Sequence, residues 1–270
     1  MRRFGLVALG AVLLLTPVAP HAQDSQTKAA EDDAAKNARQ ARAKLNAMIE
    51  AMGGQAWLTV KNRYQHGHIA GFYHGVPNPG TLEVFDFHSW PDRDRLEATK
   101  HRDVITFYIG REAWELTYRG KRPVPAEQLD DFLRRRDHSI ETAMKVWLND
   151  PKTILVYEGQ RLAARHLTDQ VTLISADNEA VTIMIDAQTH LPVKRDFQWR
   201  DPEYKDKNTD SEEYDDYHSF QGLPTAMTLT RYHNDDMSSQ RFYTAVEYNK
   251  GLDPGLFNPD NLLQPNNKKK

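Results

Sequence analysis

The chain has 270 residues, with 35 Lys or Arg against 38 Asp or Glu, so its formal net charge is −3 at pH 7. This mildly acidic balance argues against nucleic acid as a partner, because nucleic-acid sites need a basic surface. The chain has no cysteine, which excludes disulfides and a thiol nucleophile. The length allows one large β-rich domain or two small ones.

The first 22 residues have the layout of a secretory signal peptide. Met1-Arg2-Arg3 precedes an apolar segment from Leu6 to Leu15, and small residues follow up to Ala22. The apolar segment is shorter than the roughly 20 residues that a membrane-spanning helix needs. We therefore expect residues 1–22 to be removed and the protein to be exported, with an uncleaved anchor as the alternative. Because no cysteine follows the segment, we expect no lipid anchor.

A helix and five strands are expected in the first part of the mature chain. Alanine, leucine and methionine recur at near-helical spacing between Thr27 and Met52, and Gly53-Gly54 is typical of a helix C-terminus. Alternating segments separated by glycine and proline then predict strands at residues 62–70, 82–88, 93–100, 104–109 and 112–118.

A single helix is predicted from Pro125 to Asn149, with acidic residues near its start. Its apolar residues form one stripe, so this helix should cover an apolar surface, as core or as a movable lid. The stripe consists of Leu129, Phe132, Leu133, Ile140, Met144, Trp147 and Leu148.

Strands resume after this helix, at residues 154–157, 162–167, 171–176, 180–186, 193–199, 211–220, 226–233 and 241–249. Asp186 is placed to close an Asx turn before the strand at 193–199. Residues 261–270 read as a disordered basic tail. Short strands joined by tight turns predict an antiparallel sheet large enough to curl.

The strands offer more apolar faces than two helices can easily cover, which suggests a hydrophobic cavity. The alternative is a sheet that closes on itself and buries the same side chains without a cavity. The candidate cavity-lining residues are Phe107, Trp114, Leu116, Ile183, Ile185, Phe197, Trp199, Met227 and Leu229.

No common catalytic motif is present: the sequence lacks a G-x-S-x-G elbow, an H-E-x-x-H pair, a G-x-G-x-x-G turn and a P-loop. His66 and His68 share a strand face but have no third ligand at a known spacing, so we expect no metal and no cofactor. The acidic run from Asp210 to Asp216 lacks the glycine and ligand order of an EF-hand loop, so we expect it to be a solvated strand edge. Paired carboxylates at unknown distance leave an exported hydrolase as an alternative, and a periplasmic sensor or scaffold as another.

Four short segments resemble the bacterial lipoprotein-sorting carriers, LolA and LolB and their relatives. Pro91 to Arg95 and Gly110 to Trp114 are similar to that family's "P-x-x-x-R … G-x-x-x-W" run, and Asp186 to Pro192 to its "D-x-x-T-x-L-P" hairpin. The other two segments are the end of a strand, Tyr217 to Pro224, and a C-terminal pattern formed by Asn249 to Leu252 with Phe257 to Pro259.

The resemblance implies an α+β, β-rich fold: a strongly curved, open antiparallel sheet, or half-barrel, around a hydrophobic cavity covered by helices. It implies a single lipid-binding domain over residues 23–260. It also implies a periplasmic monomer that takes lipoprotein acyl chains or other lipids from an inner-membrane donor to an outer-membrane acceptor. Burial of each methylene of an acyl chain contributes roughly 0.8 kcal/mol to binding. Burial alone can therefore hold the cargo, and transfer needs no chemical step. The lid or gate candidates are Arg95, Ile140, Met144 and Trp147.

Two departures from the family pattern leave the ligand open. Carriers often have an arginine just before the proline, where this chain has Trp90, and the chain is longer than a typical carrier. Another lipid, or a sensing role, is therefore an alternative to lipoprotein sorting.

Overall fold

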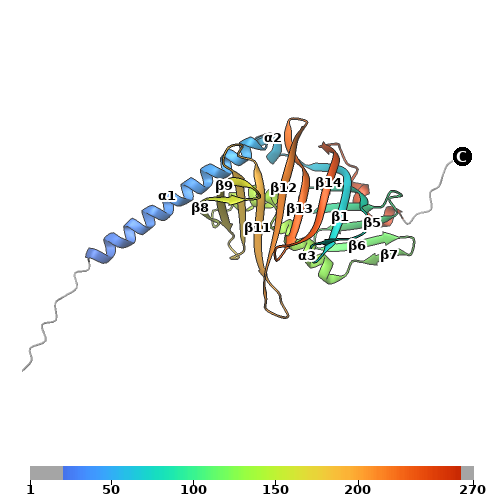
Figure 1. The fold of residues 1–270 in the computed structure, drawn as a ribbon, viewed down its shortest axis with the longest axis horizontal. Helices are drawn as coiled ribbons and strands as arrows, with labels where there is room; N and C mark the ends of the chain where they lie inside the picture. Colours follow the sequence, from blue (N-terminus) through green and yellow to red (C-terminus); the bar gives the residue numbers. More distant parts are fainter. Residues whose placement is uncertain (1–20, 263–270) are drawn as a thin grey trace, which may run out of the picture. The chain divides into compact units, whose positions relative to one another are not determined.

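A computed structural model describes residues 21–262 (Figure 1). Most of the expected signal peptide (residues 1–20) and most of the expected tail (residues 263–270) lie outside the described residues. The chain divides into two units, residues 1–36 and residues 37–270, and every strand belongs to the second unit. No helix within the described part is both long enough and apolar enough to cross a membrane.

The helices other than α1 are short. Gly53 closes α1 with a φ of 115°, a conformation that glycine adopts without strain, and Gly54 N donates to Ile49 O at 2.8 Å, which confirms the expected C-terminus. The helices and 3₁₀ turns are α1 (His21–Ala51), α2 (Gln55–Leu58), α3 (Ala126–Asp137), α4 (Ile140–Lys145), η1 (Trp147–Asn149), η2 (Pro254–Phe257) and η3 (Pro259–Leu262).

The single helix predicted over residues 125–149 is in fact three pieces, α3, α4 and η1. The break lies at His138 and Ser139. Ser139 caps α4, because its Oγ accepts a hydrogen bond from Thr142 N at 3.1 Å. The turn therefore lets α3 and α4 pack on different parts of the sheet.

Within residues 21–262, fourteen strands pair in antiparallel fashion. They are β1 (Asn62–Tyr73), β2 (Val76–Pro77), β3 (Leu82–Ser89), β4 (Arg93–Ala98), β5 (Val104–Ile109), β6 (Glu112–Thr117), β7 (Gly120–Pro123), β8 (Ile154–Ala163), β9 (His166–Ile174), β10 (Ala180–Asp186), β11 (Pro192–Arg200), β12 (Lys207–Phe220), β13 (Leu223–His233) and β14 (Asp236–Tyr248).

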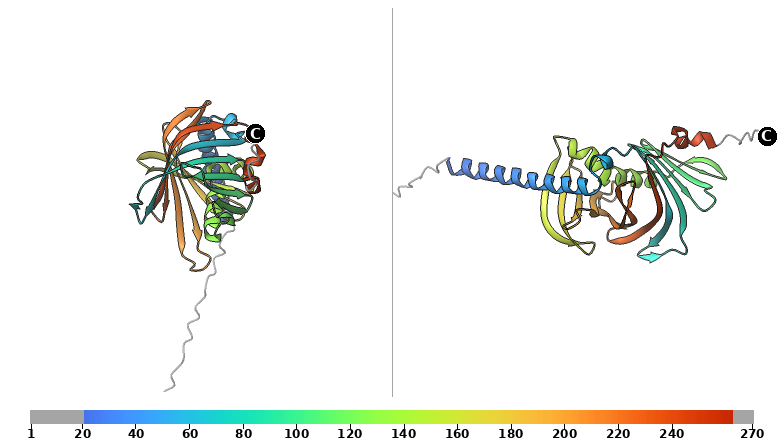
Figure 2. Two further views of the ribbon diagram at one scale, coloured as in Figure 1. Left: turned by 90° about the vertical axis from the view of Figure 1, so that its right-hand side faces the viewer. Right: turned by 90° about the horizontal axis from the view of Figure 1, so that it is seen from above.

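The sheet is open. Its strand order is β7-β6-β5-β4-β3-β1-β14-β13-β12-β11-β10-β9-β8, with β2 paired only to β1. The chain leaves the sheet at one edge strand, β7, passes through α3, α4 and η1, and re-enters at the other edge strand, β8. The strands bend strongly around these helices (Figure 2). The predicted α+β fold with a curved open antiparallel sheet is therefore confirmed.

One predicted strand is wrong. Residues 162–167 do not form one strand but contain the turn between β8 and β9, in which Ala164 and Arg165 both have positive φ. Such a turn is usually marked by Gly, Asn or Asp, and none of these stands at the two positions. The Asx turn predicted at Asp186 is confirmed, because its Oδ1 accepts from Gln188 N at 2.9 Å and from Thr189 N at 2.6 Å.

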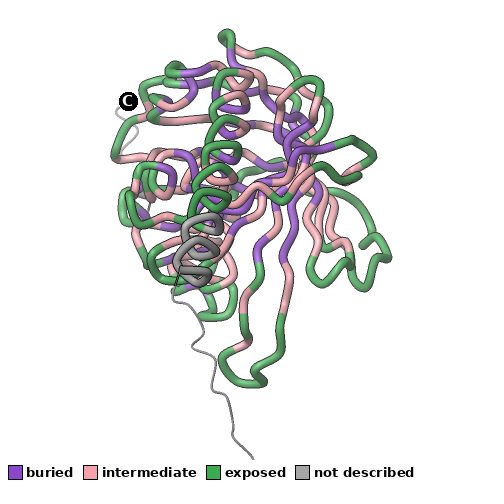
Figure 3. The backbone as a smooth tube through the Cα atoms, turned by 90° about the vertical axis from the view of Figure 1, so that its left-hand side faces the viewer, coloured by how far each residue is buried: buried purple, intermediate pink, exposed green. Residues whose placement is uncertain are grey.

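The main core lies between the sheet and the helices α1 and α4. Strand centres are buried and hairpin tips are exposed (Figure 3). Residues of α1 from Ala41 onward and residues of α4 fill the concave face over β8, β9 and β10. The side chains that meet there include Leu45, Met48, Ala143, Met144, Val171, Leu173, Val181, Ile183 and Ile185. Since α1 and α4 fill this part of the concave face, a cavity can lie only over the remaining strands.

Candidate functional site

A cavity of about 390 Å³ lies between α3, α4 and the concave face of the sheet. Strands β1, β3, β4 and β11 to β14 supply most of its wall. One part of the wall is apolar and aromatic and consists of Met52, Trp57, Trp90, Leu96, Tyr108, Phe132, Ile140, Tyr217, Ala226, Leu229 and Tyr248. The volume is within the roughly 300 to 1,000 Å³ of small-molecule sites.

The remaining wall is unexpectedly rich in charge. Six arginines and four carboxylates line the cavity, together with His88. The arginines are Arg63, Arg135, Arg136, Arg195, Arg231 and Arg241, and the carboxylates are Asp86, Asp94, Glu141 and Glu212. The lining therefore carries two more positive than negative groups when His88 is neutral, and it is amphipathic where the sequence predicted an apolar surface.

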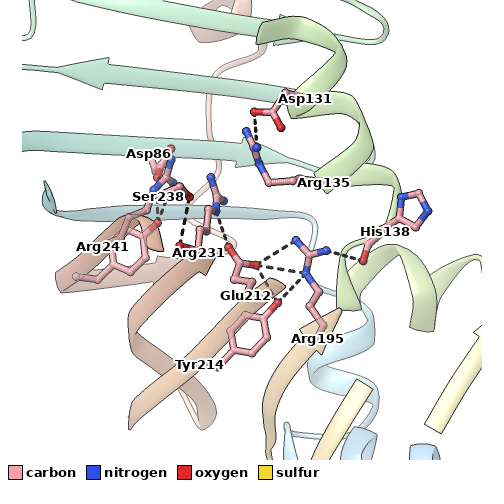
Figure 4. Close-up of polar contacts among 11 residues, drawn as sticks. Asp86, Asp131, Arg135, His138, Arg195, Glu212, Tyr214, Arg231, Ser238 and Arg241 are labelled. Carbon is pink, nitrogen blue, oxygen red and sulfur yellow. Dashed lines mark hydrogen bonds and ion pairs between the residues drawn. The ribbon is translucent and has the colours of Figure 1, made fainter. Parts of the chain in front are cut away.

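A row of alternating charges crosses β11, β12 and β13. Arg195 pairs in register with Glu212, and Glu212 with Arg231, so the three side chains share one sheet face (Figure 4). Arg195 Nη2 lies 3.3 Å from Glu212 Oε2, and Arg231 Nε lies 2.8 Å from Glu212 Oε1. Tyr214 Oη donates to Glu212 Oε2 at 2.9 Å, and Arg195 Nη1 donates to His138 O at 3.0 Å.

This row connects the sheet to the helices. Burial alone would raise the pKa of Glu212, but Arg231 and Arg195 hold it well below its ordinary value. Burial also raises the pKa of Tyr214, with Glu212 adding to the effect, so the phenol stays protonated and can donate. His138, whose carbonyl binds Arg195, stacks on Phe197 with ring centroids 4.4 Å apart. The turn between α3 and α4 is thereby held against β11.

Two further ion pairs lie along the cavity wall. Arg241 Nη1 donates to Asp86 Oδ2 at 2.8 Å, and Tyr243 Oη donates to the same oxygen at 3.1 Å. Arg63 Nη1 donates to Glu141 Oε1 at 2.8 Å and so joins β1 to α4. Burial would raise the pKa of Glu141, but Arg63 lowers it. Each of these charged groups has a protein partner, so its charge is compensated in the folded chain.

His88 and Asp94 form a less complete pair. Their Nδ1 and Oδ1 atoms are 2.7 Å apart, on neighbouring positions of β3 and β4. His88 Nε2 and Asp94 Oδ2 are both buried without a hydrogen-bond partner within the described chain. His88 lines the cavity, so its imidazole, held by Asp94, is a candidate general base, and no sequence motif pointed to it.

Only two of the predicted site residues line the large cavity: Leu229 and the lid candidate Ile140. Ile183, Ile185 and Met227 lie in the main core instead, as does the lid candidate Met144, and Trp147 packs against that core. These positions face inward as predicted, but α1 and α4 cover them.

The other predicted cavity residues lie elsewhere. Phe107 and Leu116 belong to a small separate core with Ile105, and Trp114 is half-buried with Lys121 Nζ 4.5 Å from its ring centroid. Trp199 donates its Nε1 to Asp210 at 3.1 Å. Phe197, which stacks on His138, is buried and does not line the large cavity.

The gate candidate Arg95 is buried away from the cavity. It pairs with Glu97 at 2.7 Å and donates to Leu256 O, also at 2.7 Å, so it fixes η2 and not a helix over the cavity. His66, one of the two histidines considered for a metal, has Nε2 2.8 Å from Glu83 Oε1 and stacks on Phe85.

The charged wall was the part that sequence reasoning missed. One signal was available, because Arg195 shares a strand face with Val193 and Phe197. A charge at an inward position of a strand must find a buried partner. That partner, Glu212, was assigned to a solvated edge because it belongs to the acidic run from Asp210 to Asp216.

Solved structures with the same fold include the following three proteins. A DUF1329 family protein from Desulfovibrio piger ATCC 29098 has a TM-score of 0.57 at 11% identity and covers 82% of this chain and 98% of that chain. A putative outer membrane lipoprotein-sorting protein domain from Vibrio parahaemolyticus has a TM-score of 0.53 at 10% identity, over 83% and 100%. A LolA superfamily protein from Nitrosomonas europaea has a TM-score of 0.51 at 12% identity, over 82% and 98%.

No family model and no curated protein matches the sequence. At 10 to 12% identity the structural likeness shows the fold alone. The chain thus has a LolA-like fold, and the resemblance based on its short motifs is confirmed at that level.

Proposed function

We propose that this chain, with its LolA-like fold, is a periplasmic carrier that holds the hydrocarbon part of a lipid or of a lipoprotein in the large cavity. It binds and releases this cargo without a chemical step, between a donor and an acceptor at the two membranes. The main support is the cavity of about 390 Å³ on the concave face of the sheet, together with the same fold in a putative lipoprotein-sorting domain. The signal-peptide layout of residues 1–22 supports the location.

The charged part of the wall is compatible with a hydrocarbon ligand. Four of its six arginines are paired with carboxylates of the wall: Arg63 with Glu141, Arg241 with Asp86, and both Arg195 and Arg231 with Glu212. A ligand that covers such ion pairs does not desolvate an unpaired charge. The aromatic residues Trp57, Trp90 and Phe132 offer the hydrocarbon an apolar surface.

Replacing Leu229 with Trp tests hydrocarbon binding. Leu229 lines the cavity, so the larger indole should exclude about two methylene groups of an alkyl chain, which corresponds to roughly ten-fold weaker binding. The measurement is isothermal titration of 1-dodecanol, a neutral probe, into the full chain. Leu162→Trp is the matched control, because Leu162 is 81% exposed on the β8–β9 hairpin, and it should bind as the wild type does. Undiminished binding by Leu229→Trp, or no binding by the wild type, contradicts the proposal.

A second candidate function is a hydrolase in the same cavity, favoured by the His88–Asp94 pair. Asp94 orients the imidazole, and the free Nε2 could activate water or a hydroxyl group. Ser139 also lines the cavity, but its Oγ donates to Thr142 Oγ1 at 3.0 Å and caps α4. The carrier proposal expects an ester such as p-nitrophenyl dodecanoate to be recovered intact. Hydrolysis that is lost in His88→Gln would favour the enzyme.

A further inference from the structure

Three arginines separate the large cavity from a second one. The second cavity, of about 180 Å³, is lined by residues of α3, β11, β12 and β13 and their neighbours. Arg135, Arg195 and Arg231 line both cavities. Figure 4 shows Arg135 reaching from α3 toward the sheet, where Arg195 and Arg231 flank Glu212.

These three arginines differ in how many donors remain free. Each of the three guanidinium nitrogens of Arg195 has a partner, because Nε donates to Glu212 and Tyr214, Nη1 to the His138 carbonyl and Nη2 to Glu212. Arg231 donates only through Nε, to Glu212, and among the described residues neither of its Nη groups has a protein partner. Arg135 uses Nη1 for Asp131, while its Nη2 has no hydrogen-bond partner among the described residues; its Nε also lacks one but is fully covered by protein. Arg231 and Arg135 therefore have donors available for a ligand.

The carboxylates beside these donors are already engaged. Glu212 is shared between two arginines, and Asp210 accepts from Trp199 Nε1 and binds His233 Nδ1 at 2.8 Å. Asp131, the partner of Arg135, is 37% exposed, so solvent screens its charge. Burial lowers the pKa of Arg135, and the positive charge of Arg231 lowers it further. A ligand anion between the two guanidinium groups would relieve this repulsion.

We propose that Arg135 and Arg231 bind the anionic head, a carboxylate or a phosphate, of an amphiphile whose hydrocarbon lies in the large cavity. This inference rests on the proposed carrier function and narrows its cargo to acidic lipids. A planar guanidinium suits both oxyanions, because it donates two parallel hydrogen bonds to them. The apolar wall and the free donors then recognise different ends of one molecule.

Titration of three probes at pH 8 tests the inference: dodecanoate, 1-dodecanol and inorganic phosphate. A hydrogen bond to a charged group contributes enough for roughly ten-fold in affinity, so dodecanoate should bind the wild-type chain at least ten-fold more tightly than 1-dodecanol. Arg231→Gln and Arg135→Gln should each reduce the ratio of the dodecanoate affinity to the 1-dodecanol affinity several-fold. Arg134→Gln is the matched control, because Arg134 is the neighbour on α3, lines neither cavity and stacks on Trp199; it should keep the ratio.

The outcomes separate this inference from the proposed function. Equal binding of dodecanoate and 1-dodecanol overturns the inference and leaves the carrier proposal standing. A ratio that survives both Arg231→Gln and Arg135→Gln also overturns it. If phosphate binds as tightly as dodecanoate, the site recognises a free anion and not a lipid head, and the inference fails. If neither dodecanoate nor 1-dodecanol binds, the carrier proposal itself fails.

Discussion

Replacing Glu212 with Gln is expected to lower the free energy of unfolding by about 3 to 5 kcal/mol. The carboxylate of Glu212 is 8% exposed and is the shared partner of Arg195, which is 3% exposed, and of Arg231. A neutral amide leaves the buried guanidinium group of Arg195 and the partly exposed one of Arg231 without a charged partner, and breaking a buried ion pair in this way costs more than the intact pair stabilises. Urea unfolding of the full chain at pH 7 measures the difference.

The same variant should change how stability depends on pH. Because Arg231 and Arg195 hold the folded-state pKa of Glu212 below its ordinary value of 4.5, the carboxylate stabilises the fold above about that pH. This contribution is lost as the pH falls below 4.5 toward the folded-state pKa, so the difference between wild type and Glu212→Gln should shrink there.

Glu213→Gln is the control for both measurements. Glu213 is the next residue along β12, so its side chain points to the other sheet face, where it accepts from Tyr232 Oη at 3.2 Å. Its loss should cost less than about 1 kcal/mol. Equal effects of the two substitutions would show that the charged row does not hold the concave face together.

Much of the fold could be predicted because strand periodicity and turn residues are local signals. The segments 104–109 and 180–186 are rich in β-branched and other apolar residues, have turn residues on either side, and match β5 and β10 to the residue. The β8–β9 turn was missed because Ala164 and Arg165 adopt positive φ without the residues that usually mark it. The break between α3 and α4 was missed because the apolar stripe continues across Ser139.

The cavity wall was harder to predict, since it depends on which part of the concave face the helices cover. Ile183 and Leu229 both occupy inward positions of strands, and the sequence pattern does not distinguish them. In the structure α1 and α4 pack over Ile183, while Leu229 faces the cavity. The period of a strand tells which face a residue takes, but coverage of that face is a property of tertiary packing.

The same packing bears on whether the segment 126–149 is a lid or part of the core. Its two helices differ. Phe132 of α3 lines the cavity and stacks on Tyr108 with ring centroids 3.5 Å apart. Met144 of α4 is 1% exposed and belongs to the main core with residues of α1. We therefore expect α4 to be core and any opening of the cavity to involve α3.

Met144→Ala tests this division, because deletion of a buried methionine side chain leaves a void. The free energy of unfolding should fall by about 3 kcal/mol, within the range for Met to Ala in a core. Val146→Ala is the control at the end of the same helix, where Val146 is 51% exposed, and its effect should be within about 0.5 kcal/mol. The opposite result would be a small effect of Met144→Ala in urea unfolding together with faster release of bound dodecanoate. That result would make α4 the movable element, because only a helix that detaches in the native state can lose this contact without destabilising the fold.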